Sequence, residues 1–438
     1  MKLRNLLYAT MIACAFASCS NDDDPIDNGG GNNANTDATL SVKYETPVIT
    51  RSGNTEGQDN TITSLNVYVF NGTGTNAKLE VIGTLTDESA NESKNIKVSA
   101  GDKSIVVVAN AAPEMSVNSS TLQDLYDAEK EFGASEKNGT ISMNSRTYVV
   151  SVIAGETNYL GYTKAQVGDG IYLIPTNATG GDLEEAAVKL YRNVAKINLQ
   201  KISVNTEQSK NEYSNAKFIL SDVFILHAGK MTKVVGGANP WNSTEVKTKQ
   251  SWLNGPGDMT YAKWVNTIIE WLEAQPSGAV SKKPYLTEGY VGDLKPFQIA
   301  SPISEVIAEG NTYPEQKAGE TSSIDYFYAY ENTTATHTLL VVKGKFVYGE
   351  NAVDANFPER YYSVSVGRDG MGEVAPPAGG ITRSENGVLR NLQYNIALTI
   401  QGPGWETPFG PDGGENTALD VKVEVVDFSY VNQVVEIE

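Results

Sequence analysis

Hydrophobic residues alternate with polar ones along most of this chain, and this period of two limits its fold more than any other feature. Leu40, Val42 and Tyr44 alternate with polar residues, as in a half-buried β-strand. The run 104–109 is β-branched and too short for a helix, which indicates a central strand. Many short strands separated by Gly, Asn, Ser and Thr predict an all-β sandwich architecture. Further strands are expected at 65–69, 147–153, 171–174, 188–202, 217–226, 338–348, 361–366 and 392–400.

The 438 residues are enough for two or three domains. A boundary is expected near 185–200, because a Gly-containing loop at 179–182 precedes the long strand predicted at 188–202. This divides the chain into an N-terminal sandwich, 38–188, and a C-terminal sandwich, 189–438.

Two segments have helical spacing. The segment 120–132 begins with Ser120 and Gln123 in the pattern of a capping box, and the second segment is 260–274. The second contains Trp264 and Trp271, which at this spacing favour core packing, with stacking on a sugar as the alternative.

The composition excludes several kinds of chemistry. A net charge of −19 argues against a nucleic-acid partner, because phosphate binding depends on Lys and Arg. The two cysteines, Cys14 and Cys19, both lie in the first twenty residues, so the body has no disulfide and no thiolate metal site. His227 and His337 are the only histidines and are interpreted as structural. We therefore expect no metal and no cofactor.

No catalytic motif is visible, so no catalytic residue is assigned and the chain is not expected to be an enzyme. The sequence lacks the G-x-S-x-G, H-E-x-x-H and G-x-x-x-x-G-K-[ST] patterns. A carboxylate pair of glycosidase type is defined by its separation in space, which a sequence does not show. The aromatic run 326–330 favours packing, with a ligand platform as the alternative.

The amino terminus has the pattern of an export signal. Lys2 and Arg4 precede an apolar stretch, and together residues 1–18 form a secretory signal peptide. The sequence Ala17-Ser18-Cys19 resembles a bacterial lipobox, which predicts acylation of Cys19, for example by palmitate; an ordinary signal peptide with an incidental Cys is the alternative. Residues 19–37 are expected to be a flexible tether.

The acidic cluster 22–24 within this tether resembles the surface-export signal of Bacteroidota lipoproteins. A weak calcium loop is the alternative, but the Gly and Glu of an EF-hand loop are missing.

The carboxy terminus is an amphipathic strand behind a Gly- and Pro-containing linker, 401–418. Its apolar alternation slips at Val425-Val426, which predicts a bulge or a tight bend. The tail 419–438 is either the last strand of its own sheet or a strand donated to a neighbouring molecule, and we favour donation. The donor residues would be one apolar row, followed by a second: Leu419, Val421, Val423 and Val425, then Val431, Val435 and Ile437.

The first predicted strand has the same alternation as this tail. Arg51 and Ser52 follow it in a polar loop, and a trypsin-like cut after Arg51 would free residues 38–51. Loss of the strand would leave an apolar groove with unpaired backbone groups. The tail of another molecule could refill this groove by β-strand addition.

These features together resemble the fimbrillins of Bacteroidota, the type V pilus subunits, and in particular the shaft subunit of short fimbriae. The resemblance covers nearly the whole chain and rests on five features: the signal ending at Cys19, the Thr50-Arg51 site, and the segments 191–197, 388–396 and 419–438. It implies two transthyretin-like β-sandwich domains in tandem, export as a lipoprotein, removal of the first strand by an Arg-specific protease, and polymerisation by strand exchange.

The resemblance further implies a structural shaft subunit of a surface fimbria that supports adhesion and biofilm formation. Its partners would be other copies, anchor and tip proteins, an Arg-specific trypsin-like protease, and the outer membrane through a transient lipid anchor. Three alternatives stay open at this point: a tip or accessory adhesin, an anchor subunit that keeps its lipid, and a secreted glycan-active enzyme.

Overall fold

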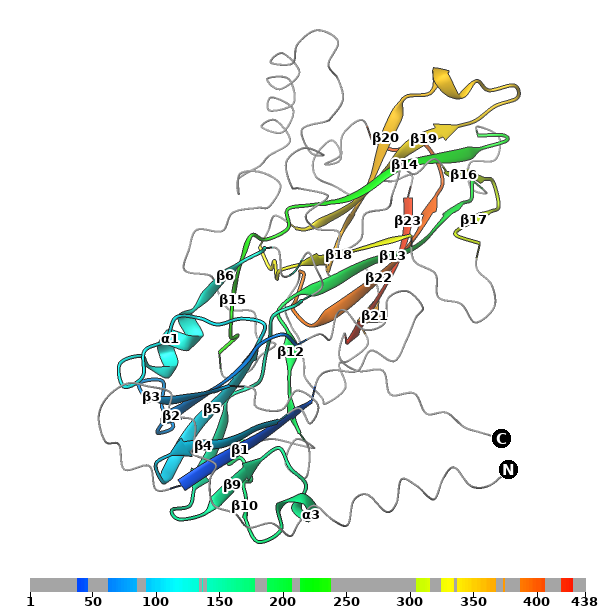
Figure 1. Ribbon diagram of the computed structural model, residues 1–438. Helices are drawn as coiled ribbons and strands as arrows, with labels where there is room; N and C mark the ends of the chain where they lie inside the picture. Colours follow the sequence, from blue (N-terminus) through cyan, green and yellow to red (C-terminus); the bar gives the residue numbers. More distant parts are fainter. Residues whose placement is uncertain are drawn as a thin grey trace, which may run out of the picture.

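The protein consists of two β-sandwiches, one following the other along the chain (Figure 1). The computed structural model describes residues 38–45, 62–84, 92–133, 136, 140–177, 187–206, 213–237, 305–315, 324–334, 337–367, 373–374, 387–405 and 419–427. The expected all-β fold of tandem sandwiches with a few short helices is confirmed. Within these ranges, no helix has the length and apolar character needed to cross a bilayer.

Two sheets form the N-terminal sandwich. One has the order β10-β9-β1-β11, and β4 also pairs with β1; the strands are β1 (Ala38–Glu45), β4 (Glu92–Val98), β9 (Thr157–Leu160), β10 (Ile171–Tyr172) and β11 (Val188–Lys189). The other has the order β12-β7-β5-β2-β3, with β8 also pairing with β5; its strands are β2 (Leu65–Asn71), β3 (Lys78–Thr84), β5 (Gly101–Ala109), β7 (Met143–Asn144), β8 (Tyr148–Val152) and β12 (Tyr191–Arg192). Alternate residues of both sheets, such as Val42 and Val107, fill the core between them.

The C-terminal sandwich is built in the same way. Its first sheet has the order β17-β13-β22-β23-β21, with β18 also pairing with β13; the strands are β13 (Ala195–Val204), β17 (Thr312–Tyr313), β18 (Asp325–Ala329), β21 (Glu373–Val374), β22 (Leu392–Ile400) and β23 (Leu419–Asp427). Its second sheet has the order β16-β14-β19-β20, with strands β14 (Lys217–Leu226), β16 (Glu305–Ala308), β19 (Leu339–Val347) and β20 (Glu359–Ser365); a short 3-10 helix, η4 (Asp354–Asn356), precedes β20.

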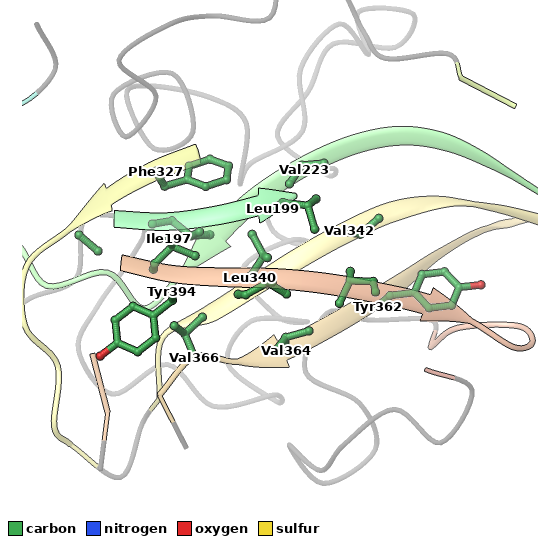
Figure 2. Packing of buried hydrophobic residues seen from close by; sticks show 14 of the residues in the cluster. Ile197, Leu199, Val223, Phe327, Leu340, Val342, Tyr362, Val364, Val366 and Tyr394 are labelled. Atoms are coloured by element: carbon green, nitrogen blue, oxygen red, sulfur yellow. The ribbon is translucent and has the colours of Figure 1, made fainter. Parts of the chain in front are cut away.

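Figure 2 shows the core of this second sandwich. Side chains from both sheets meet there, among them Leu199 and Tyr394 from one sheet and Leu340 and Val364 from the other. All four are almost completely buried. The same alternation that predicted the strands therefore supplies the apolar face that each sheet buries.

Each half of the molecule contributes a short segment that packs against the other half. Strand β6 (Glu129–Glu131) from the N-terminal half pairs with β15 (Met231–Lys233) from the C-terminal half. Phe132, directly after β6, packs in the C-terminal core, where its ring meets that of Tyr330 edge-on. In return, Val234 and Val235 pack beneath helix α1 (Leu122–Asp127) on the outer face of the N-terminal sandwich.

One predicted strand is wrong. The segment 188–202 forms three strands, because β11 pairs with β1 and β12 with β7 before β13 enters the C-terminal sheet. The domain boundary placed between residues 188 and 189 thus falls inside β11, and pairing with the first half continues to Arg192. In contrast, β14 and β22 have the predicted ends of 217–226 and 392–400.

The predicted helix 120–132 is shorter than expected. Helix α1 ends at Asp127, and Ala128 is extended, because the next residues pair with β15 in the other half. Its capping box uses Thr121 and Asp124 rather than the predicted pair one residue earlier. A second short helix, α3 (Lys164–Val167), was not predicted. The predicted helix 260–274 lies outside the described residues.

Candidate functional site

The first strand, β1, is held on both edges. It pairs antiparallel with β4 on one side and parallel with β9 on the other, and its last two residues pair with β11 (Figure 1). The strand nearest the amino terminus among the described residues is therefore an inner strand of its sheet. Taking it out would expose the backbone edges of both β4 and β9.

The apolar row of β1 faces the core, as predicted. Leu40 and Val42 have no exposed surface, and Ala38 and Tyr44 are also buried. Thr39 and Lys43, between them, are half-buried. The four inward positions, 38, 40, 42 and 44, define the space that β1 fills, which we call the β1 slot.

A buried side chain, Asn158 of β9, fixes the start of β1. Its Nδ2 donates to the main-chain oxygen of Thr39 at 3.2 Å and to those of Ile153 and Glu156 at 3.0 and 3.1 Å. Its Oδ1 accepts from the main-chain nitrogen of Ile153 at 2.9 Å. The same amide thus shapes the turn before β9 and sets the position of β1.

The opposite wall of the slot contains a β-bulge. Leu40 lies opposite Ile96 and Val42 opposite Ser93, so two residues of β4 face Ser41 alone. One of them, Asn95, has a φ of 58°, and its main-chain nitrogen lies 3.5 Å from Ser41 Oγ. The bulge marks one position in the slot and therefore favours one register of the strand that occupies it.

The end of the slot fits closely around the backbone of β1. Gly161, with a φ of +83°, lies so near that an added Cβ would be 2.2 Å from the Lys43 oxygen. The Nζ of Lys43 lies 5.9 Å from the ring centre of Tyr162, and burial raises the pKa of this tyrosine. Residue 43 therefore has a defined environment that includes a ring and, opposite it in β4, Glu92.

The tail strand lies in the sheet of its own molecule. Strand β23 pairs antiparallel with β22 from Leu419 opposite Ile400 to Asp427 opposite Leu392, and β21 pairs with its other edge. The register is continuous through Val425 and Val426, so the predicted bulge or bend is wrong. Each residue of β23 pairs with one residue of β22, because the hydrogen bonds of the backbone do not depend on the side-chain pattern.

Several predicted site residues lie outside the described residues, namely Cys19, Arg51, Ser52, Val431, Val435 and Ile437. Strand β1 ends at Glu45 and the described chain resumes at Ile62, so the Arg51-Ser52 bond falls in the segment that follows β1. The structure thus describes the slot and the first part of the tail but not the predicted lipidation and cleavage sites.

Other predicted candidates have structural surroundings. In the aromatic run, Phe327, Tyr328 and Tyr330 have no exposed surface, which supports packing over a ligand platform. His227 is buried at the end of β14, where its Nδ1 lies 3.1 Å from the main-chain oxygen of His337. In the part of the chain that the structure describes, no three His, Cys, Asp or Glu side chains are grouped to hold a metal.

Sequence reasoning found the apolar row of β1 but missed the polar residues around it. Asn158 and Gly161 contact the backbone of β1 and Asn95 lies against its Ser41 side chain, and in the sequence all three are indistinguishable from ordinary turn residues. Asn tolerates a positive φ such as that of Asn95 better than most residues do. The residue type at position 95 was therefore the one signal in the sequence for this bulge.

Comparison with known proteins shows that the chain is similar to fimbrial subunits. A family model described as "Major fimbrial subunit protein (FimA)" matches residues 38–192, from the start of β1 to the end of β12. The chain is 24% identical to major fimbrium subunit FimA type-2 of Porphyromonas gingivalis over 444 residues, and 26% identical to FimA type-3 over 459 residues; each alignment covers 99% of both chains.

Two solved structures resemble the fold. A putative cell adhesion protein from Parabacteroides distasonis matches with a TM-score of 0.54 at 25% identity, covering 89% of this chain and 99% of that one. A fimbrilin from P. gingivalis W83 matches with a TM-score of 0.55 at 21% identity, covering 91% and 99%. The relatives named here belong to a major fimbrium, whereas the sequence resemblance was drawn to the short-fimbria type.

Proposed function

The chain belongs to the fimbrillin family of Bacteroidota, and from this premise we propose that it is a shaft subunit that polymerises by exchanging β1 for the tail of another copy. The family is one of structural fimbrial subunits, so the protein acts at the cell surface as part of a fimbria, together with other fimbrial subunits. The shaft role, the exchange, the protease and the lipid are our proposal.

One observation carries the proposal: β1 is an inner strand that lies before the proposed cleavage site. It has main-chain partners on both edges and an apolar row in the core. A cut after Arg51 leaves β1 attached to the rest of the molecule by noncovalent contacts alone. A strand in this position can leave its sheet while the connections between all the other strands stay the same.

The tail matches the β1 slot in one register. With the tail in the direction of β1 and Leu419 in place of Leu40, Val421 and Val423 replace Val42 and Tyr44. Asp420 then replaces Ser41 beside the bulge, and a carboxylate can accept from the Asn95 N–H as the hydroxyl does.

Lys422 replaces Lys43 in this register, so the position opposite Glu92 keeps its positive charge. Positions 41 and 43 are thus matched in hydrogen-bond acceptance and in charge, respectively.

Burial of the tail supplies the joint between subunits. In this register three aliphatic side chains, at 419, 421 and 423, enter the slot and contribute about 4.5–9 kcal/mol before the entropy of ordering is subtracted. A register shift of one residue would turn the charged face of the tail into the core, so the pairing is specific. Exchange requires a sheet to open, which makes such a joint resistant to dissociation.

The proposed sequence of events begins with lipidation at Cys19, which holds the precursor in the outer membrane. An Arg-specific trypsin-like protease then cuts between Arg51 and Ser52 and removes β1 together with the lipid. Because β1 fills the slot until then, the precursor cannot accept a tail before it is cut. A tip or accessory adhesin is the alternative role, and the amphipathic tail, which suits donation, favours the shaft.

The cleavage step is tested with Arg51→Lys, a change that an Arg-specific protease does not cut but trypsin does. We expect this variant to accumulate as a lipidated precursor without fibres, and to polymerise when the purified protein is treated with trypsin. Amino-terminal sequencing of fibre subunits should begin at Ser52. Fibres whose subunits begin at Cys19 would contradict the proposal, as would normal fibres from Arg51→Ala.

A further inference from the structure

A lysine with no exposed side-chain surface lies against a side-chain amide in the N-terminal sandwich. The Nζ of Lys103 is 2.8 Å from Asn71 Oδ1, 2.7 Å from Ser99 Oγ and 2.7 Å from Glu80 Oε2. The Glu80 side chain is itself only 7% exposed. An amine, an amide carbonyl and a carboxylate thus meet at one point, and fimbrial assembly uses none of them.

Three neighbouring strands bring these groups together. Asn71 is the last residue of β2 and lies directly opposite Lys103 of β5, while Glu80 belongs to β3 on the other edge of β2 (Figure 1). Side chains that are directly opposite on adjacent strands are held within reach of each other. The main-chain nitrogen of Ser99 donates to Glu80 Oε1, which keeps the carboxylate turned towards the lysine.

We propose that Lys103 and Asn71 become joined by an intramolecular isopeptide bond between Nζ and Cγ, with Glu80 as the general base. Glu80 takes a proton from the ammonium, and the neutral Nζ attacks Cγ of the amide. The Cγ–Nδ2 bond breaks, and Nδ2 takes up the second proton that Nζ gives up and leaves as ammonia. The proton on Glu80 passes to the ammonia, so one amide and one ammonium ion form and Glu80 is regenerated.

The surroundings favour this reaction over two alternatives. Hydrolysis would need a water molecule held at Cγ of Asn71, whereas the Nζ of Lys103 is already fixed 2.8 Å from Oδ1 of the same amide, so the amine has the advantage of proximity. Asn71 precedes Gly72, whose backbone nitrogen could close a succinimide on the same Cγ, but this nitrogen donates to the main-chain oxygen of Asp102 at 2.9 Å. Asn71 itself is exposed at the strand end, so ammonia has a path to solvent.

The bond would close a covalent ring around the segment 72–102. This segment contains β3 and β4, and β4 is one wall of the β1 slot. When β1 is absent, β4 loses its partner on that edge, and a covalent link between β2 and β5 limits how far it can move away from the sandwich. The site is independent of the exchange itself, and its test does not depend on fibres.

The test is the intact mass of the purified, denatured full chain. We expect a mass lower by one ammonia than that of the same chain without the bond, and a branched peptide that joins Asn71 to Lys103 in a tryptic digest. Trypsin should not cut after Lys103, because its side chain is an amide. Lys103→Arg, Asn71→Ala and Glu80→Gln should each abolish the mass loss or slow its appearance at least tenfold.

Two controls keep the result specific. Ser99→Ala removes one hydrogen bond of Lys103 but none of the reacting groups, and should keep the mass loss. Lys233→Arg changes another buried lysine, one that contacts the carboxylates of Asp127 and Glu129, and should also keep it. A mass loss that persists in Lys103→Arg would identify a succinimide and overturn the proposal. A wild-type chain with no mass loss would overturn it too.

Discussion

The guanidinium of Arg390 and the carboxylate of Glu331 form an ion pair in the interior of the protein, with Nε and Oε1 3.1 Å apart. The Arg390 side chain has no exposed surface, and its Nη2 also donates to Thr232 Oγ1 at 2.9 Å and to the Lys233 oxygen at 3.1 Å. Its Nη1 lies 3.4 Å from Asn193 Oδ1, where the chain passes between the halves. One arginine, just before β22, thus links the segment after β18, strand β15 and the passage between the two sandwiches.

Removal of this arginine should destabilise the junction strongly. Arg390→Met leaves the Glu331 carboxylate buried without its counter-charge, and we expect the free energy of unfolding to fall by about 3–5 kcal/mol. Chemical denaturation monitored by circular dichroism gives the value. The double variant Arg390→Met/Glu331→Leu should recover most of the loss, since it removes the unpaired charge; equal losses in the single and double variants would contradict this explanation.

Acid should weaken the C-terminal sandwich through His227. Burial lowers the pKa of this histidine below its usual value of about 6.5, so the unfolded chain binds a proton more readily than the folded one. The stability that the neutral imidazole contributes is present above pH 6.5 and is lost as the pH falls through the folded-state pKa. His227→Asn accommodates the φ of 55° at this position and should flatten the profile of unfolding free energy between pH 7 and 5. An unchanged profile would contradict the assignment.

A charge in β1 should affect the precursor but not the fibre. Val42→Asp places a carboxylate in the core, and the uncleaved protein should lose about 3 kcal/mol or more of unfolding free energy. The fibre as proposed contains no β1, so fibres assembled from the cleaved variant should resist thermal dissociation as wild-type fibres do. Thr39→Asp, at a half-buried position, is the milder control. A fibre weakened as much as the precursor would show that β1 stays in place.

The period-two pattern predicted many of the strands but not the contacts between distant segments. The alternation of Leu40, Val42 and Tyr44 predicted the buried face of β1, because alternation depends on the strand alone. The same approach counted Phe132 as part of a helix, since its spacing from Leu125 is helical. Phe132 instead packs in the other half, and the pairing of β6 with β15 ends the helix. Tertiary pairing of this kind leaves no local signal.

The site was predicted only in part for the same reason. The apolar rows of β1 and of the tail are visible in sequence, whereas the bulge at Asn95 and the contact of Gly161 with Lys43 depend on which strands become neighbours. The alternation of the tail suits the partner β22 in its own sheet and would also suit the proposed slot of another molecule, so the pattern alone does not choose between them.

The charge at Lys422 tests the register of the tail without disturbing the monomer. In the monomer Lys422 lies opposite Ala397 in β22, so a change of its charge should leave the unfolding free energy nearly unchanged. In the slot it would lie opposite Glu92, and Lys422→Glu would place two like charges directly across from each other. We expect polymerisation of the cleaved protein, followed by light scattering, to slow about two- to fivefold.

Lys422→Met, which removes the charge without repulsion, should slow polymerisation less than Lys422→Glu. The reciprocal change Glu92→Lys should slow the wild-type tail and restore part of the rate to the Lys422→Glu tail, when the two are placed on separate donor and acceptor proteins. Rescue in this pairing requires residue 422 of one molecule to lie beside residue 92 of the next, because the two reversed charges attract each other only when they are neighbours. Equal rates for all tails on both acceptors would reject the register with Leu419 in place of Leu40. Moving the lysine two residues along the tail would then test other registers of the same exchange.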